Sequence, residues 1–251
     1  MKPPPRLTHA RELLDEPDHD PRELEASLDD VAAVNRWLGG RRALLRHLRP
    51  LLRAAARSGA GPPSILDAGT GIGDLPRAIA ERARRDGHGL RIVATDVHPQ
   101  TLEIARRRLA AWPEITVEAA DVRDLPYPDR AFDVALLSLT LHHLDDEDQI
   151  TALRELGRVA RRAVIVGELE RSWPAYVGAR ILAATVWRRN RLTRHDGPIS
   201  VLRAFTPGEL LDLARRAGLE RPHVHRHPLF RLVLVAGPIG RDAGAGRAGR
   251  P

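Results

Sequence analysis

The chain has 251 residues, a net charge of +7 and no cysteine. The missing cysteine excludes disulfides, zinc–thiolate sites and cysteine nucleophiles. The positive charge does not predict a nucleic-acid partner, because Lys2 is the only lysine and the arginines are spread along the whole chain. No stretch approaches the ~20 apolar residues of a membrane-spanning helix, and residues 1–11 lack the apolar segment of a secretory signal, so we expect a cytoplasmic protein.

The first 61 residues (1–61) predict a helical cap. Residues 1–19 are polar and rich in proline, and we expect them to be irregular. Asp20-Pro21 is a typical helix start, an N-cap followed by proline at the first helical position. Two glycines end that helix, and a second helix is predicted at 42–57, before a linker rich in glycine and proline at 58–63.

Strands and helices then alternate. The predicted elements are strand 64–68, helix 73–85, strand 90–96, helix 99–111, strands 115–121 and 132–138, helix 145–161 and strand 163–169. The strands are continuous apolar runs, as expected of parallel strands that are buried on both faces. This alternation predicts an α/β fold with a doubly wound, Rossmann-like parallel sheet.

The alternation breaks after the fifth strand. Residues 171–205 form an insertion rich in arginine and aromatic residues, which we expect to cover the substrate. The remaining elements are a helix at 206–217 and strands at 222–228 and 229–237, which can pair only as an antiparallel hairpin. The main domain therefore covers 62–237, and the Gly/Arg-rich tail at 238–251 is predicted to be disordered.

The segment ILDAGTGIGDLP, residues 65–76, joins the first strand to the helix that follows it. Its three glycines follow a G-x-G-x-G pattern, one residue short of the dinucleotide fingerprint, and the G-K-[ST] of a P-loop is absent. Asp67 and Asp74 flank the loop and would repel a pyrophosphate by about 1 kcal/mol each. The loop therefore favours a positively charged ligand, and S-adenosylmethionine has a sulfonium, an ammonium and no phosphate.

LDAGTGIGD resembles the first motif of the class I S-adenosylmethionine-dependent methyltransferases, and FDVALLSLTLHHL is similar to their fourth-strand motif. Asp96 ends the second strand, where the family's acid accepts hydrogen bonds from the ribose hydroxyls, and Asp121 ends the third, where the family holds the adenine edge. The resemblance covers about residues 62–170 and implies S-adenosylmethionine as cofactor and a seven-stranded sheet. The residues implied for cofactor binding are Asp67, Gly69, Thr70, Gly71, Gly73, Asp96, Val97, Asp121, Val122 and Ser138.

Two groups of residues are candidates for taking a proton from a hydroxyl acceptor. His142 and His143 follow the fourth strand, and Glu168 ends the fifth. If these strands are neighbours, a His–Glu pair can form in which the glutamate orients the imidazole and raises its basicity. In the insertion, His195-Asp196 followed by Gly197-Pro198 is interpreted as a shaped turn, with His195 a second candidate base and Asp196 a substrate contact.

Aromatic residues predict where the acceptor binds. Residues 173–194 combine Tyr176 and two tryptophans with an apolar run and several arginines. This pattern fits a lid over a hydrophobic acceptor, a helix lying in a membrane interface, or an amphipathic helix packed on the core. We expect Tyr176, and Trp37 from the N-terminal helices, to contact the acceptor.

Two other groups contain side chains of types that bind metals in other proteins. His223, His225 and His227 share one face of a predicted strand, and the acidic run DDEDQ lies at 145–149. The hairpin is far from the predicted pocket, and acids are favoured at a helix N-terminus for electrostatic reasons. We therefore expect no metal.

These patterns predict methyl transfer from S-adenosylmethionine to a small, hydrophobic, hydroxylated acceptor, through a phenolic, polyketide or sugar oxygen. The alternatives are carbon methylation of a quinol-like ring, as in methyltransferases of quinone biosynthesis, and a non-catalytic S-adenosylmethionine-binding protein. A Rossmann oxidoreductase is disfavoured by the glycine spacing. Methylation of a nucleobase amine is disfavoured because Ser138-Leu139-Thr140-Leu141 replaces the N/D-P-P-Y run of those enzymes. The sequence does not indicate the oligomeric state.

Overall fold

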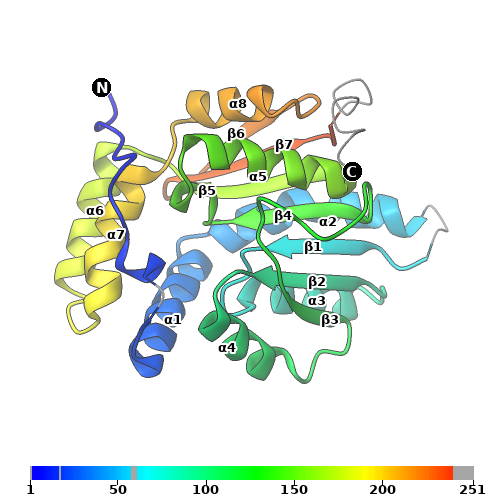
Figure 1. Cartoon of the computed structure of the whole chain (residues 1–251), viewed down its shortest axis with the longest axis horizontal. Helices are drawn as coiled ribbons and strands as arrows, with labels where there is room; N and C mark the ends of the chain where they lie inside the picture. The colour runs from blue at the N-terminus through cyan, green and yellow to red at the C-terminus, as the bar shows by residue number, and fades with distance from the viewer. Residues whose placement is uncertain (1, 17, 58–60, 240–251) are drawn as a thin grey trace, which may run out of the picture.

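The structure is a computed structural model that describes residues 2–16, 18–57 and 61–239. It contains a seven-stranded sheet in the order β3-β2-β1-β4-β5-β7-β6 (Figure 1). The strands are β1 (Ser64–Ala68), β2 (Arg91–Asp96), β3 (Ile115–Ala119), β4 (Phe132–Ser138), β5 (Ala160–Leu169), β6 (His223–His227) and β7 (Arg231–Ala236). β1 to β5 are parallel, while β7 pairs antiparallel with both β5 and β6. The predicted doubly wound sheet with its terminal hairpin is confirmed.

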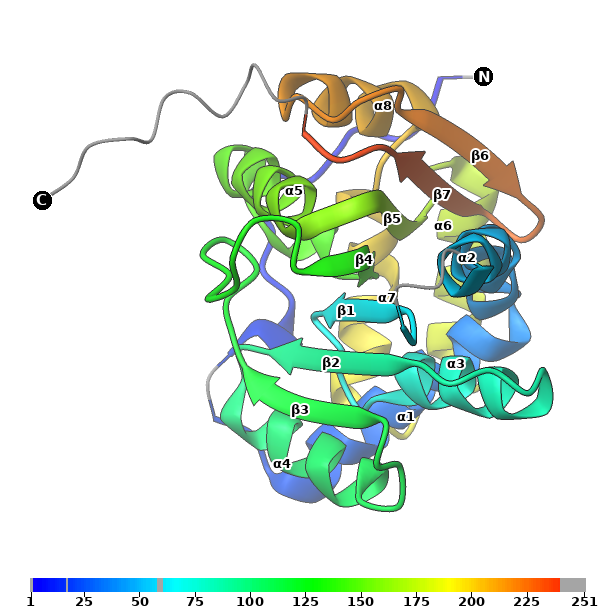
Figure 2. The ribbon, with the colours of Figure 1, turned by 90° about the vertical axis from the view of Figure 1, so that its right-hand side faces the viewer.

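Helices cover both faces of this sheet, as Figure 2 shows. The helices are α1 (Pro21–Trp37), α2 (Gly40–Arg57), α3 (Asp74–Arg85), α4 (Pro99–Leu109), α5 (Asp146–Val159), α6 (Trp173–Ala184), α7 (Arg191–Arg203) and α8 (Pro207–Arg216). Alternate strand residues pack against α2 and α3 on one face and against α5 and α8 on the other. Both faces of the central strands are therefore buried, which explains their unbroken apolar sequence.

Three helices and the N-terminal segment gather beyond the carboxyl ends of the parallel strands. Figure 1 shows α1, α6 and α7 next to the arrowheads of the strands, with residues 2–16, here called the N-terminal segment, running over them. This segment is bound to α7: the backbone N–H groups of Leu13 and Leu14 donate to the carboxylate of Asp196, and that of Leu7 donates to the carbonyl of Leu202. The end of the sheet where ligands bind in such folds is thus covered.

Some predicted elements differ from the observed ones. Residues 195–198, interpreted as a turn, lie inside α7, so that prediction is wrong. Helical geometry persists there because tertiary contacts override the local preference of Gly197-Pro198: a Cβ on Gly197 would lie 2.5 Å from the ring of Trp187, so only glycine allows this close packing. β5 begins at Ala160, three residues before the predicted start at 163. Residues 58–60 of the predicted linker and 240–251 of the predicted tail lie outside the described residues.

Candidate functional site

A large cavity of about 1130 Å³ lies at the carboxyl ends of the parallel strands. Its lining comes from the glycine loop, the ends of β1, β2 and β4, the N-terminal segment, α1, α6 and α7. The predicted cofactor residues in the lining are Asp67, Gly69, Thr70, Gly71, Asp96, Val97, Asp121, Val122 and Ser138. Gly73 is outside this lining and instead precedes α3.

The glycine loop has a backbone that other residues would not easily adopt. Gly69 and Gly73 have φ of 63° and 77°, in the left-handed region. A Cβ on Gly69 would lie 2.5 Å from the Thr140 hydroxyl, and a Cβ on Gly73 would lie 2.5 Å from Leu109. The loop is tied to β2, because the N–H of Gly71 donates to Asp96 Oδ2 over 3.0 Å. These constraints aim the start of α3 at the cavity.

Asp67 places a buried carboxyl group against the cavity, with only 1% of the residue exposed. Burial is the main cause that raises the pKa of Asp67 to about 7; the Thr70 hydroxyl, which donates to Oδ2 over 2.7 Å, opposes the rise, and the charges of Asp74 and Asp96 add to it. Oδ1 of Asp67 and Oδ2 of Asp74 are buried and have no hydrogen-bond partner. Such atoms cost free energy unless a ligand supplies donors or positive charge.

Two further acids follow the next strands. Asp96 accepts the N–H of Gly71 on Oδ2 and that of His98 on Oδ1, both over 3.0 Å, and burial raises its pKa. Each carboxylate oxygen keeps a second lone pair that can accept from a ligand hydroxyl. Asp121 is paired with Arg123 over 2.6 Å, and the hydrogen bonds from Arg123 lower its pKa. The acids predicted to bind the cofactor therefore line one end of one cavity.

Comparison with known proteins indicates which kind of domain carries these acids. The methyltransferase domain family matches residues 65–163, which include the glycine loop and all three acids. Residues 65–163 form a methyltransferase domain. Two curated relatives match across this domain: a malonyl-[acyl-carrier protein] O-methyltransferase of Halorhodospira halophila, 34% identical over 52% of this chain, and a demethylmenaquinone methyltransferase of Thermus thermophilus, 39% identical over 39% of it. These matches span only 39% and 42% of the relatives' own lengths.

Solved structures confirm the fold of the methyltransferase domain. A SAM-dependent methyltransferase from Aquifex aeolicus has a TM-score of 0.60, 17% sequence identity and coverage of 87% of this chain and 98% of its own. The structure titled PigF with SAH has a TM-score of 0.56 and 25% identity, and covers 88% of this chain and 63% of its own. The predicted class I S-adenosylmethionine-dependent methyltransferase fold is confirmed.

S-adenosylmethionine fits the donor and acceptor groups around the methyltransferase domain's cavity. The unpartnered oxygens of Asp67 and Asp74 match a ligand with positive charge. Asp96 matches a pair of neighbouring hydroxyls. The acids at the glycine loop would repel a phosphate, so the charge distribution agrees with the cofactor predicted from the sequence.

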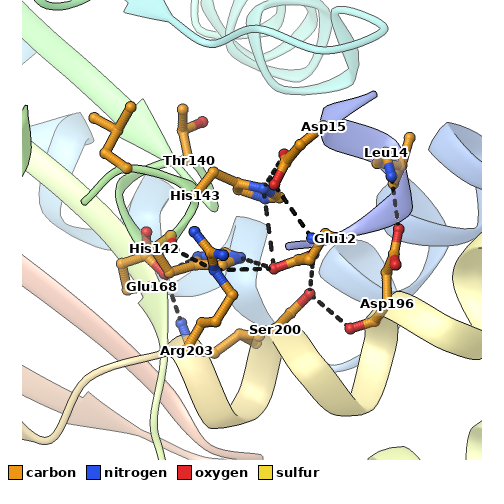
Figure 3. Close-up of polar contacts among 12 residues, drawn as sticks. Glu12, Leu14, Asp15, Thr140, His142, His143, Glu168, Asp196, Ser200 and Arg203 are labelled. Atoms are coloured by element: carbon orange, nitrogen blue, oxygen red, sulfur yellow. Dashed lines mark hydrogen bonds and ion pairs between the residues drawn. The ribbon is translucent and has the colours of Figure 1, made fainter. Parts of the chain in front are cut away.

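Next to these acids, the methyltransferase domain presents two histidines, each paired with a carboxylate. Nδ1 of His142 lies 2.7 Å from Glu168 Oε2, across the neighbouring strands β4 and β5 (Figure 3). Nδ1 of His143 lies 2.7 Å from Asp15 Oδ1. Burial opposes the charge of His143, but the carboxylates of Glu12 and Asp15 outweigh it and raise its pKa to about 9. His143 is therefore a cation near neutral pH, whereas the bond to Glu168 leaves Nε2 of His142 as the ring nitrogen free to accept a proton.

The carboxylate of Glu12 faces both histidines in Figure 3, and the sequence did not point to it. Its Oε1 is 3.9 Å from Nε2 of His142, 3.9 Å from Nδ1 of His143 and 3.6 Å from Nε of Arg203, and its Oε2 accepts from Ser200 over 2.6 Å. Within the described ranges, Glu12, His142 and His143 form a group whose ligand atoms all lie within 4.8 Å, the spacing that a metal ion needs. Arg203 already supplies positive charge there, so the absence of a metal stays our prediction.

Three of the other predicted site residues, Trp37, Tyr176 and His195, lie outside the cavity lining. Trp37 is 73% exposed and stacks with Arg36, and Tyr176 packs against Trp173; neither belongs to the cavity lining. His195 is bonded to Asp196 over 2.7 Å and is also outside the lining. Asp196 does line the cavity, where it holds the N-terminal segment.

The membrane-interface interpretation of residues 173–194 stays a prediction. Val177 and Ile181 of α6 are exposed large hydrophobic residues. In the part of the chain that the structure describes, no helix has the length and apolarity needed to span a bilayer.

Proposed function

We propose that the protein transfers a methyl group from S-adenosylmethionine to an oxygen of a small, hydrophobic, hydroxylated acceptor, and that His142 is the general base. The observation that carries this proposal is the 2.7 Å contact that Glu168 makes with His142, which lines the same cavity as the acids of the glycine loop. A phenolic, polyketide or sugar hydroxyl has a proton to lose, and a histidine held by a carboxylate is the group that handles such a proton.

In the proposed mechanism, the cofactor supplies a methyl group on a sulfonium, which is a good leaving group. Asp67 and Asp74 would hold its positive charge, and Asp96 would hold the ribose hydroxyls. Nε2 of His142 would take the proton of the acceptor hydroxyl as the methyl group passes from the sulfonium sulfur to that oxygen, with S-adenosylhomocysteine as the second product. Glu168 stabilises the imidazolium through Nδ1. The N-terminal segment excludes water, which strengthens each of these electrostatic contacts.

Carbon methylation of a quinol-like ring is the second candidate function. It is supported by the demethylmenaquinone methyltransferase among the relatives, 39% identical over 99 residues. Loss of a ring proton in that reaction also needs a base, so the same His142–Glu168 pair serves both candidates. Release of S-adenosylhomocysteine should be measured against a panel of phenols, quinols and sugars, with the methylated atom identified by mass spectrometry and NMR. We expect turnover with an O-methylated product. Binding of the cofactor without turnover on any member of the panel would favour a non-catalytic binding protein.

The raised pKa of Asp67 predicts that cofactor affinity depends on pH. With a pKa of about 7, the carboxyl group is largely protonated at pH 6 and largely ionised at pH 8. Only the ionised form attracts a cationic ligand, so lowering the pH from 8 to 6 should weaken S-adenosylmethionine binding about 10-fold. Isothermal titration calorimetry across this range tests the prediction. Asp67→Asn should bind weakly at both pH values, and an unchanged pH dependence in this variant would assign the effect to another group.

A further inference from the structure

Arg231 is a buried cation whose partner is missing. It begins β7, is among the largest fully buried side chains with 2% of the residue exposed, and lines the cavity. Its Nε and Nη1 are buried and have no hydrogen-bond partner. Burial lowers the pKa of Arg231 to about 10, against the opposing charge of Glu168, so the side chain is still cationic at neutral pH. A buried charge with unmet donors is costly, and proteins retain one mainly where a ligand will meet it.

The surroundings of Arg231 hold it in place and offset its charge only in part, through Glu168. Glu168 attracts Arg231, but its Oε2 is engaged with His142, and no carboxylate of the described residues forms an ion pair with Arg231. The turn before β7 is strained: Leu229 and Phe230 have φ of 58° and 59°, which non-glycine residues seldom adopt. The N–H of Glu170 donates to the carbonyl of Phe230 and fixes this turn. Strain of this kind persists where the surrounding structure determines the conformation, and it is concentrated at functional sites.

At Gly40, the junction of α1 and α2 packs closely against the guanidinium and the Asn35 side chain. A Cβ on Gly40 would lie 3.3 Å from Nε of Arg231 and 2.0 Å from Oδ1 of Asn35. Asn35 is itself buried and lines the cavity. The neutral amide of Asn35, which can both donate and accept hydrogen bonds, therefore lies near the guanidinium of Arg231 in the cavity lining.

Arg231 is at the end of the cavity opposite the cofactor acids. Three strand spacings separate β7 from β1, which is about 14 Å, and the ribose-binding Asp96 is one strand farther away on β2. His142, which follows β4, and Glu168, on the neighbouring β5, lie between the two ends. A ligand group that reaches Arg231 is therefore on the acceptor's side of the proposed base.

We propose that Arg231 binds a carboxylate of the methyl acceptor, so that the substrate is a hydroxylated apolar acid. This inference rests on the proposed function. A carboxylate satisfies the unmet donors, neutralises the charge and forms the charge-assisted hydrogen bonds for which guanidinium is suited. Together with the Asn35 side chain, the site selects acids over their neutral analogues and orients the acceptor with its hydroxyl toward His142.

Calorimetry on the full chain saturated with S-adenosylhomocysteine tests this proposal, with 1-naphthoate and the neutral 1-naphthamide as matched probes. We expect the acid to bind about 10- to 100-fold tighter than the amide, because hydrogen bonds to a charged group contribute free energy of this size. The preference should disappear in Arg231→Gln and partly persist in Arg231→Lys. Arg221→Gln, an exposed arginine near the start of β6, should leave it unchanged.

The thermal stability of Arg231→Gln distinguishes a folded variant that has lost the binding site from a misfolded one. Because Arg231 is buried and unpaired, Arg231→Gln should raise the Tm, by about 2–4 °C, instead of lowering it. Equal binding of acid and amide by the wild-type protein would overturn the inference while leaving the proposed function intact, provided that S-adenosylhomocysteine binds. A loss of S-adenosylhomocysteine affinity in Arg231→Gln would also overturn it, because the carboxylate recognised would then be the cofactor's own. Failure of the wild-type protein to bind S-adenosylhomocysteine would instead reject the proposed function.

Discussion

Replacing His142 with alanine is expected to lower kcat about 10²- to 10⁴-fold, the usual contribution of a general base. The affinity for S-adenosylhomocysteine should stay unchanged, because His142 contacts Glu168 and not the acids of the glycine loop. Single-turnover rates and calorimetry measure the two quantities separately. His195→Ala is the matched control: this histidine is also bonded to a carboxylate, but it lies outside the cavity lining and should keep the full rate.

A double-mutant cycle then tests whether His142 acts together with Glu168. Glu168→Gln keeps the size of the side chain but removes the charge that stabilises the imidazolium, so we expect a large loss of rate from this change alone. If the two residues act as a unit, the double variant should be scarcely slower than His142→Ala. Losses that simply add would show that the 2.7 Å contact has no role in catalysis, and His143→Gln would then be the next variant to test.

The sheet and the cofactor end of the cavity follow from local sequence patterns. Each parallel strand is an apolar run, and the acids predicted to bind the cofactor lie at the end of a strand or in the segment that follows it. The carboxyl ends of parallel strands meet at one edge, so their relative positions are set by topology alone. A contact between Glu168 and a histidine was predicted for the same reason, because it needs only that β4 and β5 are neighbours, but the sequence did not decide between His142 and His143.

The acceptor end was not predictable in this way. Glu12 and Asp15 lie in a proline-rich segment without a periodic pattern, and Asp15 meets a histidine 128 residues farther along the chain. Asp196 was predicted to contact the substrate, but its carboxylate holds the N–H groups of Leu13 and Leu14. Contacts between distant irregular segments depend on tertiary packing, about which local sequence carries little information.

Arg231 escaped sequence analysis for a different reason. It precedes the apolar run LVLVA in a strand that is buried on both faces, so an alternating pattern that would mark an inward-facing residue is absent. A lone arginine at the start of a strand is ordinarily a solvated end. Its burial arises because the strained turn at Leu229 and Phe230 and the end of β5 place it beneath α1 and α2.

Replacing Asp96 with alanine is expected to weaken cofactor binding by about 1–3 kcal/mol, through the loss of charge-assisted hydrogen bonds to the ribose. The same carboxylate also holds the N–H groups of Gly71 and His98, so part of the loss would come from a looser glycine loop. Asp96→Asn separates the two effects, because the amide keeps one acceptor oxygen for the loop but no charge for the ribose. Asp212→Ala, an exposed acid on α8, is the control.

The identity of the cofactor can be judged from the same variants. Asp67, Asp74 and Asp96 surround the loop with negative charge, and an anionic ligand would have to overcome it. We therefore expect the wild-type protein to bind S-adenosylmethionine and to reject NAD and ATP in a thermal-shift titration. In Asp96→Ala, the difference in affinity between S-adenosylmethionine and NAD or ATP should become smaller, because S-adenosylmethionine binds more weakly. An Asp96→Ala variant with unchanged affinity for S-adenosylmethionine would contradict the ribose assignment, and tighter binding of NAD than of S-adenosylmethionine by the wild type would contradict the electrostatic argument itself.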